Sequence, residues 1–252
     1  MDTIEALIKQ KPHLLHPLRF YEKTLRFMDA VKELRIPSRP GLNAYPPEFT
    51  GRIVEEFLSV FDLPEGSLSP LKQALELCEI DFTRIPLLEV PSFSLPYAED
   101  DLTMLLFLLS RPFFFGLRVA HHPDNRQGNE GRCPVCSARP SLLSLAAGSK
   151  RDAHCSFCGA EGPGNSAGCP LCLTRDAAKL GDYAFHGEEG FKVHTCDACK
   201  AYVKTVDKGL LSRITPDLAD LMSLPLDVVI QGKGYKRPSP NPIGMLRMSA
   251  NG

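Results

Sequence analysis

The sequence predicts an α+β protein, with a helical N-terminal domain, two small rubredoxin/zinc-ribbon-like metal modules and a C-terminal helix. Apolar residues recur at helical spacing through the first hundred residues. Eight of the nine cysteines then fall between Cys133 and Cys199, and a helical pattern returns after Thr215. The expected parts are a helical domain at 1–128, a first metal module at 129–165, a second at 166–212, and a C-terminal helix and tail at 213–252.

Length and composition exclude several classes of protein. A chain of 252 residues can bury a core without the help of metals or disulfides. With 43% apolar and 23% charged residues, it is neither intrinsically disordered nor collagen-like. The net charge of -1 disfavours a nucleic acid or an anionic membrane as the partner.

No targeting or membrane segment is expected. Residues 1–10 contain two acidic side chains and no apolar run of signal-peptide length, so the expected location is the cytoplasm. The most apolar stretch, 102–120, is interrupted by Arg111, Pro112 and Arg118. It therefore predicts two buried helical pieces, the second restarting at Pro112, rather than a membrane span.

The N-terminal helices are expected in runs separated by prolines. These runs are Leu18–Leu34, Phe49–Phe61, Leu68–Ile80 and Asp101–Ser110. Cys78 follows the leucines of the third run, so we expect a small buried apolar residue there. The pair His121 and His122 follows the apolar helix, where a helix-dipole interaction is favoured over a metal or acid–base role.

Four C-x-x-C pairs dominate the second half of the sequence. Random placement of nine cysteines would give only about 0.3 such pairs. A C-x-x-C turn points two thiolates at one centre, and two turns complete a tetrahedral site of four sulfurs. The pairs are Cys133/Cys136, Cys155/Cys158, Cys169/Cys172 and Cys196/Cys199.

An internal repeat indicates how the pairs combine. Cys-Pro-Val-Cys at 133–136 parallels Cys-Pro-Leu-Cys at 169–172, which favours two sequential four-cysteine sites over a cross-braced arrangement. Disulfides and thioredoxin-like redox chemistry are less favoured, given the expected reducing compartment and the ribbon-like spacing. A closed four-sulfur site has no open coordination position, so we expect no catalytic residue.

The residues do not separate zinc from iron, because tetrahedral thiolate cages accept both. His154 and His194 lie near the cysteine pairs, where a solvent-facing or supporting role is favoured over ligation. The glycine-rich segment 159–168 is expected to be a linker. A solvated face is the simplest interpretation of the lysine cluster, which comprises Lys192, Lys200, Lys204 and Lys208.

Short strands are expected at Ser141–Ala146 and Phe191–Thr195. Thr215-Pro216-Asp217 supplies an N-cap and a proline at the first helical position of a C-terminal amphipathic helix. The tail from Gln231 is rich in Gly, Pro and basic residues and is expected to be irregular.

Several of these segments resemble one known family, the FdhE-type accessory proteins required for formation of active formate dehydrogenase. Residues 133–140 and 154–158 are similar to the family's first metal unit, and residues 196–207 are similar to its second. Residues 217–221 and 234–242 are similar to its closing helix and tail. The segment 159–168 departs from the family, which usually has bulky strand residues there.

The resemblance implies a cytoplasmic, non-enzymatic factor whose eight paired cysteines bind two metal ions, iron being favoured and zinc an alternative. It implies a partner, the immature molybdenum- or tungsten-containing catalytic subunit of formate dehydrogenase. Homo-oligomerisation is left open. The alternatives are a rubredoxin-like electron carrier and a nucleic-acid-binding zinc-ribbon protein.

Overall fold

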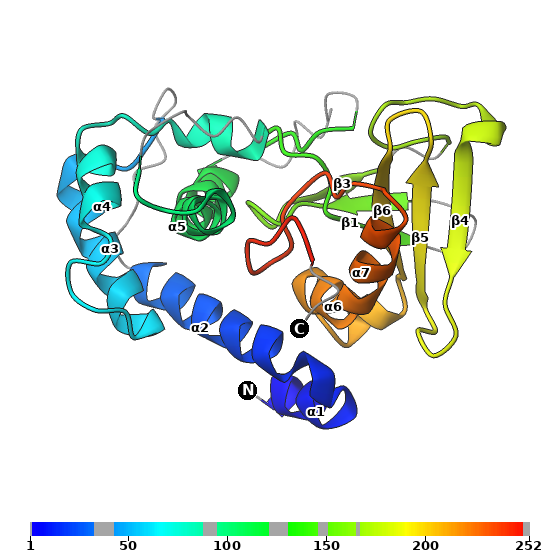
Figure 1. The fold of residues 1–252 in the computed structure, drawn as a ribbon, viewed down its shortest axis with the longest axis horizontal. Coiled ribbons are helices and arrows are strands. Elements are labelled where there is room, and N and C mark those ends of the chain that lie inside the picture. The colour runs from blue at the N-terminus through cyan, green and yellow to red at the C-terminus, as the bar shows by residue number, and fades with distance from the viewer. Residues whose placement is uncertain are drawn as a thin grey trace.

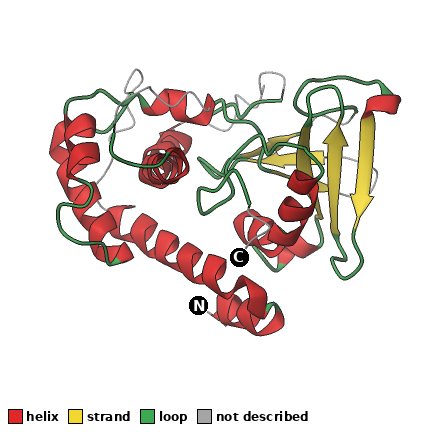
Figure 2. Cartoon of the chain, in the orientation of Figure 1, coloured by secondary structure: helices red, strands yellow, loops and turns green. Residues whose placement is uncertain are grey.

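The computed structural model describes residues 2–32, 43–87, 95–120, 131–145, 151–164 and 167–248. Helices occupy one side of the molecule and a six-stranded sheet the other, with two further short helices against the sheet (Figure 1). Figure 2 shows the same division by secondary structure. The α+β class predicted from the sequence is confirmed.

The helical side follows the predicted runs, with boundaries set by prolines and turns. Pro47 and Pro70 occupy the first turns of their helices, where the missing N–H has no intrahelical partner to lose. The elements are α1 (Asp2–Gln10), η1 (Pro12–Leu14), α2 (Leu15–Val31), α3 (Pro47–Phe61), α4 (Ser69–Glu76), η3 (Phe82–Leu87) and α5 (Glu99–Ala120). His121 and His122 lie outside the described residues.

The expected burial of Cys78 is wrong. Helix α4 buries Leu71, Ala74 and Leu75, but it ends at Glu76, so the helical spacing no longer applies two residues later. Cys78 instead has a positive φ of 56° and an exposed side chain. The predicted run Leu68–Ile80 therefore extends past the turn at which α4 ends.

The apolar stretch forms one helix, not the two pieces expected. Helix α5 runs through Pro112 because the Tyr45 hydroxyl bridges the helix at this point. It accepts a hydrogen bond from the Phe113 N–H (2.8 Å) and donates one to the Leu109 carbonyl (3.0 Å). A side chain inserted into the helical ladder in this way is a known means of accommodating a break.

Helix α5 alone among the described helices is long and apolar enough to cross a membrane, and 61% of its most apolar window is buried in the protein. Burial of this kind is found in the core helix of a globular domain. Phe107 and Phe113, for example, are 0% and 1% exposed.

Both cysteine-rich segments contribute to a single sheet. Its strand order is β3-β2-β1-β6-β5-β4, and all pairs are antiparallel except β1 with β6, which are parallel. The parallel pair, with Leu142 opposite Lys204, joins the two segments. The strands are β1 (Leu142–Leu145), β2 (Arg151–His154), β3 (Glu161–Pro163), β4 (Leu180–Ala184), β5 (Phe191–Cys196) and β6 (Ala201–Asp207).

Part of the glycine-rich segment 159–168, which was expected to be a linker, forms a strand. Strand β3 lies within it and pairs with β2, with Gly162 opposite Ala153. Backbone hydrogen bonds need no bulky side chain, so a strand with the sequence Glu-Gly-Pro can still extend the edge of the sheet.

The C-terminal helical region consists of two helices, α6 (Pro216–Met222) and α7 (Leu224–Gly232), rather than one. The predicted cap is confirmed, since the Thr215 side chain accepts from the Leu218 N–H. The tail was expected to be irregular from Gln231, but α7 continues to Gly232. The described part at 233–248 is irregular, and Arg237, Ser239 and Asn241 within it are buried.

The lysine cluster is not a uniform solvated face. Lys192, Lys200 and Lys208 are exposed, but Lys204 is 0% exposed. Side chains alternate along β6, so Lys204 lies on the same side as Tyr202 and Val206, which pack with residues of α6 and α7. The helices therefore cover a lysine that the sequence pattern assigned to solvent.

Candidate metal centres

The structure gathers eight cysteines into two groups of four sulfurs, in the sequential arrangement that the repeat predicts. Within each group the sulfur atoms all lie within 4.8 Å of one another. The first site contains Cys133, Cys136, Cys155 and Cys158, and the second contains Cys169, Cys172, Cys196 and Cys199.

The distances between the sulfur atoms suit a metal ion with tetrahedral coordination. Metal–sulfur bonds of ~2.3 Å place tetrahedral sulfurs about 3.8 Å apart. In the second site, Cys169 and Cys199 are 3.8 Å apart and Cys172 and Cys196 are 3.7 Å apart. The corresponding pairs of the first site are each 3.4 Å apart, slightly more compressed.

Each C-x-x-C loop uses the same backbone turn. The residue after its second cysteine has a positive φ, and these residues are Ser137, Gly159, Leu173 and Lys200. In the first three loops the N–H of that residue donates to the carbonyl of the first cysteine, at 2.9, 2.9 and 3.1 Å. Because only one of the four is glycine, the positive φ could not be recognised from residue type.

The local electrostatics favour a bound cation. Burial raises the pKa of the Cys136 thiol, whereas hydrogen bonding, chiefly with Cys136, lowers the pKa of Cys133. Unequal sharing of protons is expected when thiols crowd together, since several adjacent thiolates repel one another. Four sulfurs, with the Leu171 N–H donating to Cys169 Sγ at 3.4 Å, therefore fit zinc or iron.

The first site is embedded in the core of the helical side. Cys136, Cys155 and Cys158 are buried, and all three belong to the apolar cluster that includes α3 and α5. Phe157, within the second loop, makes edge-to-face contacts with Phe107 and Phe114, with ring centroids 4.9 and 5.8 Å apart. An ion at this site would connect the sheet to the helical core.

The second site lies closer to solvent. Cys172 is exposed and Cys199 is partly exposed, whereas Cys169 and Cys196 are buried. The buried pair packs against the sheet with Leu143, Leu171 and Val203. An ion here would order the sheet side and remain near the protein surface.

The two sites are directly linked by an arginine. Arg139, three residues after Cys136, donates to the Leu171 carbonyl inside the second site's first loop at 2.5 Å. The residue was not singled out from the sequence. The internal repeat could have drawn attention to Arg139, because Arg175 lies at the equivalent position, three residues after Cys172.

Neither nearby histidine joins a sulfur group. His154 is 4% exposed and its Nε2 lies 2.9 Å from Ser144 Oγ. His194 pairs with Asp182 across the β4–β5 ladder. Burial is the main cause that lowers the pKa of each imidazole.

Comparison with known proteins connects this arrangement to one family. Residues 172–244 match the model of the FdhE C-terminal domain, a range that holds three cysteines of the second site, both C-terminal helices and most of the tail. The chain thus resembles FdhE proteins over this C-terminal part. Its resemblance to FdhE proteins also extends outside that domain.

Curated relatives match about half of the chain. It is 30% identical over 146 residues to an FdhE homologue of Haemophilus influenzae, covering 54% of this chain and 48% of that protein. It is 31% identical over 131 residues to FdhE of Escherichia coli, covering 50% and 40%. The matched region thus spans less than half the length of these relatives.

A solved structure shares the fold over nearly the whole chain. The crystal structure of the FdhE protein from Pseudomonas aeruginosa superimposes with a TM-score of 0.67 at 18% sequence identity. The alignment covers 99% of this chain and 95% of that one. The shared fold therefore includes the N-terminal helices.

Proposed function

We propose that this chain is a cytoplasmic accessory factor for formate dehydrogenase, which binds the immature catalytic subunit and assists its conversion to the active form. The observation that carries the proposal is the FdhE C-terminal domain at 172–244, which includes most of the second four-sulfur site. The chain acts as a binding protein and not as an enzyme.

The eight paired cysteines hold two metal ions, with iron favoured and zinc the alternative. Four protein sulfurs occupy all four positions of a tetrahedral coordination sphere and leave none for water or substrate. The ions therefore stabilise the fold rather than perform catalysis. The helical domain at 1–128, metal modules at 129–165 and 166–212, and C-terminal region at 213–252 together form the platform for the partner.

A deletion strain tests the accessory role. Formate dehydrogenase activity should be lost while the level of its catalytic subunit is maintained, and wild-type chain should restore the activity. Cys136→Ser with Cys172→Ser, which removes one ligand from each site, should not restore it. Cys78→Ser is the control because Cys78 lies outside both sites, and unchanged activity in the deletion strain would falsify the proposal.

The partial exposure of the second site supports one rival function, electron transfer, since a surface-proximal ion can exchange electrons with a partner. A rubredoxin-like carrier would contain iron and show a reversible redox couple. Elemental analysis and the visible spectrum of the purified, untagged protein decide this point. Zinc alone at both sites would reject the electron carrier and leave the accessory role standing.

A further inference from the structure

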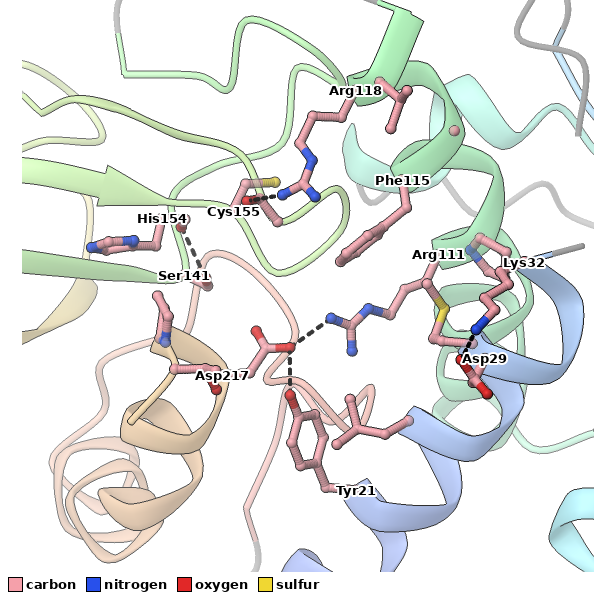
Figure 3. Close-up of a pocket in the computed structure, with 18 of the residues that line it drawn as sticks. Tyr21, Asp29, Lys32, Arg111, Phe115, Arg118, Ser141, His154, Cys155 and Asp217 are labelled. Carbon is pink, nitrogen blue, oxygen red and sulfur yellow. Dashed lines mark hydrogen bonds and ion pairs between the residues drawn. The ribbon is translucent and has the colours of Figure 1, made fainter. Parts of the chain in front are cut away.

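A cavity of about 730 Å³ lies where the helical side, the first metal module and α6 meet (Figure 3). Its walls come from α2, α5, the strand and loop around Cys155, and the start of α6. The volume is within the usual range of roughly 300–1,000 Å³ for ligand sites. Cys155 of the first four-sulfur group is among its lining residues, and the other seven paired cysteines are not.

A buried arginine gives this cavity an unused hydrogen-bond donor. Arg111 is 2% exposed and extends from α5 toward Asp217, to which its Nη2 donates at 2.7 Å (Figure 3). Its Nη1 donates to the Pro242 carbonyl at 3.1 Å, whereas its Nε has no partner in the described part of the chain. Burying an N–H without an acceptor is unfavourable, so this atom points to a ligand that supplies one.

A second arginine places a further positive charge at the cavity, which Glu161 and the ion-paired Asp29, Asp217 and Asp220 also line. Arg118 is exposed, and its Nη1 donates to the Gly159 carbonyl at 2.6 Å. Among the described residues no carboxylate lies within 4 Å of its guanidinium. Phe115 lies near both arginines, with its ring centroid 5.4 Å from the Arg111 guanidinium and 4.9 Å from that of Arg118, which helps to hold them in place.

The rim of the cavity is apolar and exposed on two different helices. Leu25 of α2 is 43% exposed, and Val119 of α5 is 82% exposed. Both line the cavity, so its apolar wall continues onto the molecular surface. A small molecule enclosed in the cavity would not use such a rim, whereas a polypeptide entering from the surface would cover it.

We propose that this cavity binds an extended peptide segment of the client subunit, placing an apolar side chain between Leu25 and Val119 and a carboxylate at Arg118. A backbone carbonyl of the segment accepts from Arg111 Nε. The assignment of the segment to the client rests on the proposed function. The chemistry required of the segment, an acidic residue near an apolar one, comes from the cavity itself.

Binding measurements with two exposed-site variants test the proposal. Arg118→Gln removes the charge and Val119→Ser removes the apolar rim, and neither residue belongs to the buried core. The matched controls are Arg175→Gln and Leu77→Ser, which alter an exposed arginine and a leucine that is 61% exposed, both outside the cavity. Circular dichroism establishes that every variant is folded.

The probes are the purified, cofactor-free catalytic subunit of formate dehydrogenase and short overlapping synthetic peptides covering its sequence. We expect each cavity variant to bind the subunit about tenfold more weakly, with the controls unchanged. At least one peptide should bind, and replacing its acidic residue by the corresponding amide should weaken binding to wild type but not to Arg118→Gln.

The outcomes separate the two proposals. If wild type and both cavity variants bind the subunit equally, the cavity proposal is overturned and the accessory role stands. Binding of a peptide that is indifferent to its acidic residue also overturns the assignment at Arg118. If wild type binds neither subunit nor peptide, and the deletion strain keeps formate dehydrogenase activity, both proposals fail.

Discussion

Lys204 of β6 and Asp227 of α7 form a fully buried ion pair, with Lys204 Nζ 2.5 Å from Asp227 Oδ2. Asp220 of α6 and Arg237 of the tail complete a network of two acids and two bases, each at most 2% exposed in its side chain. The network connects the sheet, both C-terminal helices and the tail. Its charges balance, so burial leaves no net charge uncompensated.

Breaking this network by removing one partner should strongly destabilise the protein. Lys204→Met keeps an unbranched side chain but leaves Asp227 without its closest cation, and we expect a loss of about 3–5 kcal/mol in the free energy of unfolding. Denaturant unfolding measures it. Lys192→Met, at an exposed position in the neighbouring strand, should change stability by no more than about 0.5 kcal/mol. Equal losses of unfolding free energy for the two substitutions would show that the buried ion pair adds no stability beyond that of an exposed lysine.

The same network predicts that the free energy of unfolding decreases at acidic pH. Burial raises the pKa of Asp227, but the adjacent charges of Lys204 and Arg237 outweigh it, so the pKa lies below its ordinary value. The stabilisation is therefore complete above the unfolded-state pKa of about 3.9 and is lost as pH falls through the lower folded-state pKa. The difference in unfolding free energy between wild type and Asp227→Asn should shrink below about pH 4. A difference that stays constant there would contradict this account.

The bridge at Pro112 can be tested by removing a single oxygen. Tyr45→Phe takes away the hydroxyl that accepts from the Phe113 N–H and donates to the Leu109 carbonyl, both in the core. We expect a loss of roughly 1–3 kcal/mol in the free energy of unfolding, with faster amide exchange at Phe113. Tyr97→Phe is the control, because that hydroxyl donates to the Ser67 carbonyl at a partly exposed position. A small effect at Tyr45 would mean that Phe113 bonds Leu109 directly once the hydroxyl is gone.

Loss of each metal should have different consequences. Cys136→Ser alters a buried cysteine of the helical core cluster, so it should remove one equivalent of metal and also lower the melting temperature of the helices. Cys172→Ser alters an exposed ligand of the second site and should remove one equivalent while the helices melt as in wild type.

Elemental analysis and circular dichroism check both effects, and Cys78→Ser, outside either site, should keep two equivalents. Identical melting of the helices in Cys136→Ser and Cys172→Ser would argue against the first site as a link between sheet and helical core. Loss of both metals in Cys172→Ser would show instead that the two sites fold as a unit, in keeping with the contact between Arg139 and Leu171.

The sequence alone determined the features that depend on residues close together in the chain. The four C-x-x-C pairs, their sequential grouping, the N-terminal helical runs and the Thr215 cap all follow from spacing within a few turns or within one repeat. Such patterns are local, because a turn or a helical face is specified by residues close together in the chain.

Only the tertiary structure shows where long-range contacts override the expectations from local sequence. Tyr45, more than sixty residues away in sequence, carries α5 through Pro112, and α7 covers the lysine that the pattern of charges assigned to solvent. The parallel pairing of β1 with β6 and the cavity between α2, α5 and α6 likewise join distant segments. These features are stabilised by contacts between residues that are far apart in the sequence. Patterns of local spacing do not specify such contacts, so only the folded structure shows them.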